Sequence, residues 1–194
     1  MDLDGRLPTG FSLKSDSKGR EILRHWLYGD GEDISIEDGD WGEYMKDDEI
    51  LKDKTRDIVM EYANELANGE SVEVDITTSM EIENGEDIIG YQYLHGTNMD
   101  AGGYHITGTI TKTENGDVML ELTYTWNDII DPNLMYSTDK WKSEFANWFA
   151  NPQDYQIHIT WHDKTIIYAD GTSEGWLADE NVTNDCEESG GGSR

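Results

Sequence analysis

The spacing of apolar residues changes abruptly at Ser71, and this change limits the folds open to the chain. Before it, from about Asp47 to Asn68, apolar side chains recur every three to four residues, which predicts an amphipathic helix that ends at Gly69. After it, as far as Ile82, apolar and polar residues alternate, as they do in a half-buried strand. Because helical and alternating stretches are segregated, an α+β fold is favoured over a parallel α/β sheet.

Turn signals divide the alternating region into separate strands. Asn-Gly pairs at 84–85 and 115–116 are strong hairpin signals, and they predict a four-stranded meander. Two later strands, joined by a turn near His162, and a short pairing that reaches Leu177 would extend it. The whole is expected to be a six- to seven-stranded antiparallel sheet, curled or closed into a small barrel. The six expected strands are 71–82, 89–93, 104–111, 118–126, 155–161 and 165–168.

N-terminal helices are expected to pack on this sheet. The first covers 19–28 and stops at Gly29, and an acidic loop follows over 30–40. One helix inserted between the strands, over 138–150, would cover an opening of the sheet. These elements define a single α+β domain, preceded by a linker or leader and followed by a disordered acidic tail. The expected divisions are 1–18, 19–178 and 179–194.

The composition of the chain argues against several classes of protein. The 194 residues include 14 Lys and Arg against 42 Asp and Glu, a formal net charge of −28, which repels nucleic-acid backbones. Cys186 is the single cysteine, so an internal disulfide is not available. No apolar run of about 18 residues predicts a membrane helix, and the acidic start of the chain does not resemble a signal peptide.

The segment from Trp126 to Asp139 carries the strongest candidates for chemistry. Asp128 and Asp131 are expected at the exit of a buried strand, where loops held by a rigid sheet often carry function. If the domain is an enzyme, Asp128 is its principal carboxylate, and Asp131 or Asp139 helps to bind Mg²⁺ or Ca²⁺. The alternative is that Asp128 and Asp131 only shape the turn before Pro132.

The other residues that could carry chemistry have ordinary structural explanations. The histidines are expected at surface or edge positions. His158 and His162 would lie about 13 Å apart in a strand, too far to share one metal ion unless the turn folds His162 back. The acidic residues of 30–40 do not have the spacing of an EF-hand, which favours a solvated loop. Most tryptophans recur at inward positions and are expected in the core. The five in question are Trp126, Trp141, Trp148, Trp161 and Trp176.

Two stretches resemble secreted toxins of bacteria. Residues 1–6, Met-Asp-Leu-Asp-Gly-Arg, resemble the Asp-Pro-Asp-Gly-Arg segment that closes the core of Rhs repeat proteins, with Leu3 in place of the proline. Residues 20–168 resemble toxin modules at the C-termini of polymorphic and type VI secreted effectors, on the stretches 23–32, 93–97 and 126–133. This resemblance implies an effector that is delivered without its own N-terminal signal peptide and is neutralised by a cognate immunity protein.

The layout also resembles the catalytic domain of colicin M and related bacteriocins. A short helix ends in Gly-x-Gly, hairpins with Asn-Gly turns follow, and an acidic motif comes at a strand exit. The family's motif is Asp-x-Tyr-Asp followed by His-Arg, and it hydrolyses the undecaprenyl-pyrophosphate linkage. Asp128 stands at the second aspartate, whereas Asn127 replaces the tyrosine and 132–140 contain no His-Arg pair.

These observations favour an antibacterial effector domain that acts in the periplasm or envelope of a target cell, on a lipid-linked envelope substrate. The rival hypothesis is a non-catalytic binding module, either a barrel for a hydrophobic ligand or an acidic immunity protein. Complementary charge would speed the capture of a basic toxin by such an immunity protein. An immunity gene should follow a toxin gene, whereas an effector should continue from repeat-rich or secretion-linked sequence.

Overall fold

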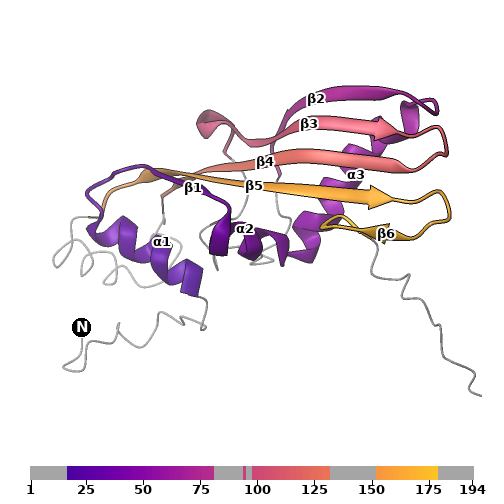
Figure 1. The fold of residues 1–194 in the computed structure, drawn as a ribbon. Helices are drawn as coiled ribbons and strands as arrows, with labels where there is room; N and C mark the ends of the chain where they lie inside the picture. Colours follow the sequence, from indigo (N-terminus) through magenta and orange to yellow (C-terminus); the bar gives the residue numbers. More distant parts are fainter. Residues whose placement is uncertain (1–16, 81–93, 95–97, 132–151, 179–194) are drawn as a thin grey trace, which may run out of the picture.

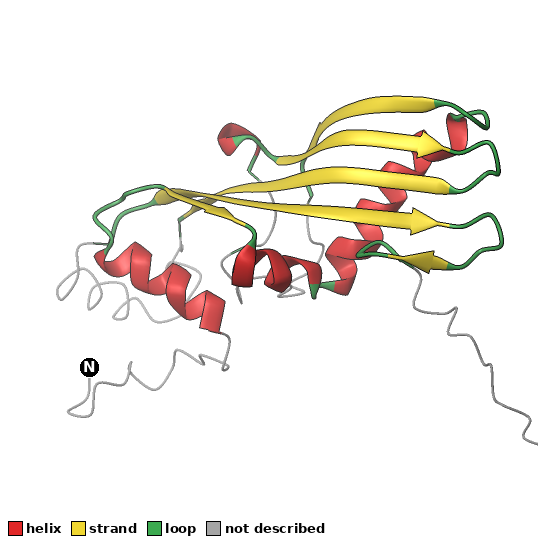
Figure 2. Ribbon diagram, viewed as in Figure 1, coloured by secondary structure: helices red, strands yellow, loops and turns green. Residues whose placement is uncertain are grey.

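The computed structural model describes residues 17–80, 94, 98–131 and 152–178 of the chain. They form an α+β fold in which helices lie on one side of a mixed sheet (Figures 1 and 2). The helical elements are α1 (Ser17–Tyr28), α2 (Gly39–Lys46), α3 (Glu49–Glu65) and the 3-10 turn η2 (Met99–Ala101). The strands are β1 (Ile34–Glu37), β2 (Ser71–Thr78), β3 (Tyr104–Lys112), β4 (Val118–Ile130), β5 (Tyr155–Ile167) and β6 (Ser173–Glu174).

The strand order differs from the predicted antiparallel meander or barrel. The strands follow the order β1-β5-β4-β3-β2, with β6 paired to β5, and the two ends of this path do not pair with each other among the described residues. The sheet is therefore open there. It is also mixed, because β1 runs parallel to β5 whereas the other pairs are antiparallel. β2 and β3 pair directly with each other, so the predicted order, in which another strand separates them, is wrong.

The expected acidic loop over 30–40 is wrong. Ile34 and Ile36 alternate with polar residues and pair with Ile157 and Ile159 of β5, so this segment forms an edge strand. The chain then turns into α2, which buries Trp41 and two further residues against the sheet. Local composition suggested a loop because acidic residues flank both elements, but burial of a few apolar side chains decides the structure.

Residues 155–167 form one strand rather than two strands joined by a turn. All thirteen residues of β5 pair in register with β4, including His162 opposite Thr123. Polar side chains on the covered face satisfy one another, because the Thr165 hydroxyl donates to Asp163 Oδ2 (2.8 Å) and the Trp176 amide donates to the same oxygen (3.1 Å). The strand can therefore continue through positions that look like a turn in the sequence.

Aromatic rings fill the layer between sheet and helices. Tyr124 and Trp161 stack with centroids 5.5 Å apart, and Trp176 packs edge-on against both. The buried Thr55 hydroxyl of α3 hydrogen-bonds to the Tyr104 hydroxyl (2.9 Å), which joins helix and sheet. Burial of Trp126, Trp161 and Trp176 confirms the expected core positions, whereas Trp141 and Trp148 lie outside the described residues.

Several expected features fall on other parts of the chain. The turn at 84–85, the strand 89–93, the inserted helix 138–150 and the tail 179–194 lie outside the described residues. Of the expected leader 1–18, only Ser17 and Lys18 are described, and they begin α1. Within the described part of the chain, no helix is both long and apolar enough to cross a membrane.

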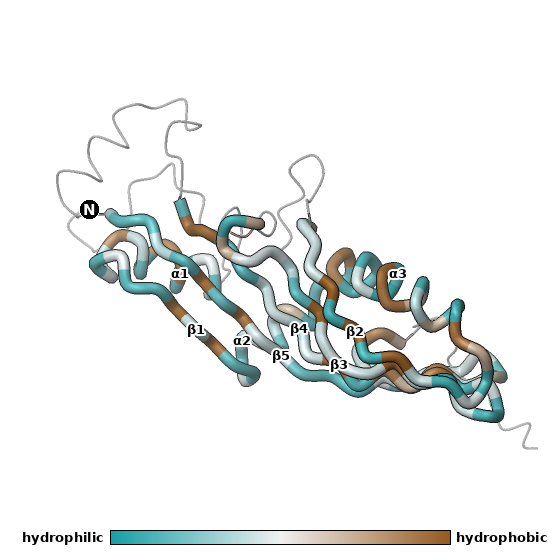
Figure 3. The backbone as a smooth tube through the Cα atoms, turned by 90° about the horizontal axis from the view of Figure 1, so that it is seen from above, coloured by the Kyte–Doolittle hydropathy of each residue, from teal (hydrophilic) through white to brown (hydrophobic). Residues whose placement is uncertain are grey.

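The side of the sheet that faces away from the helices is polar. We call this side, formed by the outward positions of β1 to β5, the open face. Figure 3 shows apolar and polar segments alternating along the strands. His105, His158 and His162 all have outward positions in β3 and β5. Seven threonines share them: Thr77, Thr107, Thr109, Thr111, Thr123, Thr125 and Thr160.

Candidate functional site

Asp128 lies inside a strand and not at its exit. β4 continues to Ile130, and Asp128 pairs with Ile157 of β5. Its position is in phase with Tyr124 and Trp126, which point toward the helices, and only 7% of the residue is exposed. The carboxyl therefore belongs to the covered side of the sheet, near the end of the aromatic core.

This environment changes the acidity of Asp128. Burial raises its pKa to about 7, and the negative charge of Asp131 adds to the rise. The Ile129 amide donates a hydrogen bond to Oδ1 (2.9 Å), which acts to lower the pKa. The Trp126 indole N–H also acts to lower the pKa, although among the described residues this N–H has no partner within hydrogen-bond distance. Asp128 can thus hold or release a proton near neutral pH.

The other two predicted site residues differ in status. Asp131 is exposed just after β4, and its charge reaches Asp128. Asp139 lies outside the described residues. Among the residues that the structure places, Asp128 and Asp131 do not belong to a group of three metal-ligating side chains. A Mg²⁺ or Ca²⁺ ion at Asp128 and Asp131 stays a prediction, as does the alternative in which Asp139 helps to bind it.

Asn127 forms a polar network on the open face. Its Nδ2 donates to the Gly103 carbonyl oxygen (2.8 Å), and its Oδ1 lies 2.6 Å from His158 Nδ1. Since a carbonyl oxygen can only accept, the amide orientation is determined and His158 Nδ1 must carry the proton. From the sequence, His158 is expected at an ordinary surface or edge position, and no structural role is expected for Asn127.

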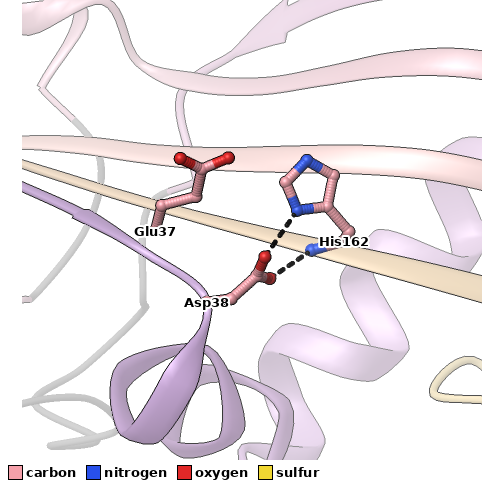
Figure 4. Close-up of side chains that lie close together, drawn as sticks. All are labelled: Glu37, Asp38 and His162. Atoms are coloured by element: carbon pink, nitrogen blue, oxygen red, sulfur yellow. Dashed lines mark hydrogen bonds and ion pairs between the residues drawn. The ribbon is translucent and has the colours of Figure 1, made fainter.

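Glu37, Asp38 and His162 form a second group, shown in Figure 4. One ligand atom from each residue lies within 4.8 Å of those of the other two. Asp38 accepts hydrogen bonds from the His162 backbone amide (3.1 Å) and from Nδ1 of its ring (2.9 Å). Burial acts to raise the pKa of Asp38, but these hydrogen bonds outweigh it and lower the pKa.

This group was not predicted from the sequence. The alternation of Ile34 and Ile36 with polar residues was the available signal, since it predicts a strand that turns Ser35 and Glu37 to one face. No local pattern indicates that this strand pairs with β5, which is far away in the sequence. Asp38 and His162, for example, are 124 residues apart. His158 and His162 contact different residues, Asn127 and Asp38 respectively.

The comparisons with known proteins found distant structural similarity. No family model matches the sequence, and no curated protein matches it. The crystal structure of pectocin M2 is similar with a TM-score of 0.43 and 16% identity over 81% of this chain and 53% of that chain. The truncated bacteriocin syringacin M from Pseudomonas syringae pv. tomato DC3000 has a TM-score of 0.43 and 15% identity over 74% of this chain and 58% of its own. The chain thus spans little more than half the length of these structures.

Proposed function

We propose that this chain is the toxin domain of an antibacterial effector and that it hydrolyses a lipid-linked pyrophosphate precursor at the envelope. One structural observation carries the proposal: the buried carboxyl of Asp128 has a pKa raised to about 7. Perturbed carboxyls of this kind cluster at functional sites. Asp128 is also the position that resembles the second aspartate of the colicin M motif, so sequence and electrostatics point to the same residue.

The chemistry follows from the two protonation states of Asp128. The ionised carboxylate accepts a proton from a water molecule that attacks phosphorus, the P–O bond to the lipid breaks, and the protonated form returns a proton to the leaving oxygen. A carboxyl that titrates near neutral pH is suited to both transfers. Mg²⁺ or Ca²⁺, which Asp131 or Asp139 would help to bind beside Asp128, would offset the repulsion between pyrophosphate and a chain of net charge −28.

Delivery belongs to the same proposal. The resemblance of residues 1–6 to the closing segment of Rhs cores supports a toxin that is carried by a larger secreted protein, as in type VI secretion. Such a toxin requires a cognate immunity protein in the producing cell and acts in the periplasm or envelope of the target cell.

Growth inhibition tests the proposal. The full chain is expressed in bacterial cells with and without a periplasmic targeting signal, as wild type, Asp128→Asn and Asp75→Asn. Asp75 is a matched control, because it is an exposed carboxylate that contacts His105 on the open face. Periplasmic wild type and Asp75→Asn should stop growth, whereas Asp128→Asn at equal abundance should not. Unchanged growth with the wild type in both compartments would refute the toxin assignment.

A purified assay separates toxicity from the proposed reaction. The wild-type chain with Mg²⁺ or Ca²⁺ should release the pyrophosphate-linked headgroup from a lipid-linked precursor. Chromatography of the lipid product measures this release. Asp128→Asn should lower the rate by at least about a hundredfold, in the range expected for loss of a general acid–base group. Toxicity without cleavage would support the toxin assignment but refute the lipid-linked precursor as its substrate.

An acidic immunity protein is the second candidate function. The net charge of −28 favours it, because a basic toxin would be captured quickly by complementary charge. The alternative of a barrel that binds a hydrophobic ligand is not supported, since the described strands form an open sheet. Tight binding to a basic protein encoded next to this chain, together with protection of cells that express that protein, would decide for the immunity role.

A further inference from the structure

The group of Glu37, Asp38 and His162 has the composition of a metal site. We call it the edge cluster, because β1 lies at one end of the strand order. Glu37 is the last residue of β1, Asp38 precedes α2, and His162 lies in β5. One imidazole nitrogen and two carboxylate oxygens are donors that Zn²⁺ accepts, with water completing its coordination.

Backbone contacts hold the edge cluster in place. The Asp38 amide donates to the Thr160 carbonyl oxygen (2.8 Å), which continues the pairing of β1 with β5. Asp38 has a positive φ of 52°, a conformation that few residues other than glycine adopt. Its carboxylate is then directed at His162 of the neighbouring strand. The relative positions of the three side chains therefore come from strand pairing and from the turn into α2.

The distances suit an ion in place of a proton. His162 Nδ1 and Asp38 Oδ2 are 2.9 Å apart. Two atoms that each lie roughly 2.1 Å from one ion are about 3.0–3.4 Å apart in octahedral or tetrahedral geometry. A metal ion can thus enter between these atoms with a small movement while the Nδ1 proton goes to solvent. Glu37, whose carboxylate lies within 4.8 Å of both partners, supplies the third ligand.

We propose that Glu37, Asp38 and His162 bind a divalent transition-metal ion, with Zn²⁺ as the best fit to the donors. The edge cluster lies on the open face, whereas Asp128 lies on the covered side, so the proposal is independent of the hydrolytic site. Bound Zn²⁺ would link the four-residue strand β1 to β5 by ligand bonds in addition to their backbone pairing. Binding to the folded state alone raises the unfolding temperature.

The open face provides a control for the edge cluster. His105 Nε2 lies 2.7 Å from Asp75 Oδ1, so this pair also combines an imidazole with an exposed carboxylate. Within the described part of the chain, the pair is not joined by a third metal-ligating side chain. If binding needs all three ligands, loss of His162 should weaken it and loss of His105 should not. General attraction of cations to an acidic protein would make the two substitutions equivalent.

Calorimetric titration of Zn²⁺ tests the proposal on the full chain. A Cys186→Ser background removes the thiol, and excess Mg²⁺ occupies weak carboxylate sites. We expect one saturable site whose affinity falls at least about tenfold in Glu37→Gln and in His162→Gln. His105→Gln should bind within about twofold of the parent, since this substitution leaves all three proposed ligands intact.

Thermal unfolding with and without Zn²⁺ gives a second measurement. The midpoint of the parent and of His105→Gln should rise on addition of Zn²⁺, whereas that of His162→Gln should not. Because His162 is exposed, its Gln variant should fold, and circular dichroism without metal checks this. Equal loss of binding in His105→Gln and His162→Gln, retained binding in His162→Gln, or no saturable binding by the parent would overturn the proposal.

Discussion

Replacing Asp128 by Asn should change how the stability of the fold depends on pH. Burial raises the pKa of Asp128 to about 7 in the folded chain, against an ordinary value of 3.8. Between these values the folded state keeps a proton that the unfolded state has released. The free energy of unfolding therefore falls as pH rises through this window. The stabilisation from the bound proton is fully present below pH 3.8 and is lost above about pH 7.

The size of this effect follows from the two pKa values. They differ by roughly three pH units, and each unit corresponds to about 1.4 kcal/mol, so the upper limit is about 4 kcal/mol. Relaxation around a newly charged group lowers this figure, and about 2–4 kcal/mol is a realistic range. In a chain of this length, each kcal/mol moves the unfolding midpoint by about 2–4 °C. The midpoint of Asp128→Asn should therefore exceed that of wild type by roughly 5–15 °C at alkaline pH.

Thermal unfolding followed by circular dichroism, from about pH 4.5 to 8.5, measures the difference on either side of the transition. The Asn side chain keeps the shape of Asp128 and an oxygen for the Ile129 amide, but it does not ionise. The midpoint of Asp128→Asn minus that of wild type should widen as pH rises, with little change for the exposed control Asp75→Asn. A difference that stays constant with pH would show that Asp128 ionises normally and would refute the reasoning.

Three further predictions concern the packing of the domain. Thr55→Val leaves the buried hydroxyl of Tyr104 without its 2.9 Å partner and should cost about 1–3 kcal/mol in urea unfolding, most of which Tyr104→Phe should restore in the double variant. Gly108→Ala should cost about 1–3 kcal/mol or prevent folding, because its φ is 138° and a Cβ would meet the Glu121 carbonyl oxygen. Deletion of 179–194 should leave the thermal midpoint unchanged, whereas a deletion that also removes Leu177, fully buried beneath β5, should lower it markedly.

The local elements of the fold are predictable because each has its own repeating pattern. The helix expected over 47–68 is α3, which begins at Glu49 and has apolar residues on one face. The alternating stretches expected over 104–111 and 118–126 are β3 and β4, and their inward aromatic residues form the core. In these elements, every residue that decides the structure lies within a few positions of the next, so the sequence contains the information directly.

The sequence by itself therefore determined the α+β class, the main helices and strands, and the acidic character of the chain. Tertiary structure alone decided that β1 runs parallel to β5, with Ile34 opposite Ile157. It also decided that β5 continues through His162 and that Asp128 lies on the covered side of the sheet. The physical reason is distance along the chain. An alternating pattern states that one face of a strand is buried, but the partner strand, its direction and its register depend on segments that are far away in the sequence. The acidity of Asp128 and the edge cluster arise from those pairings.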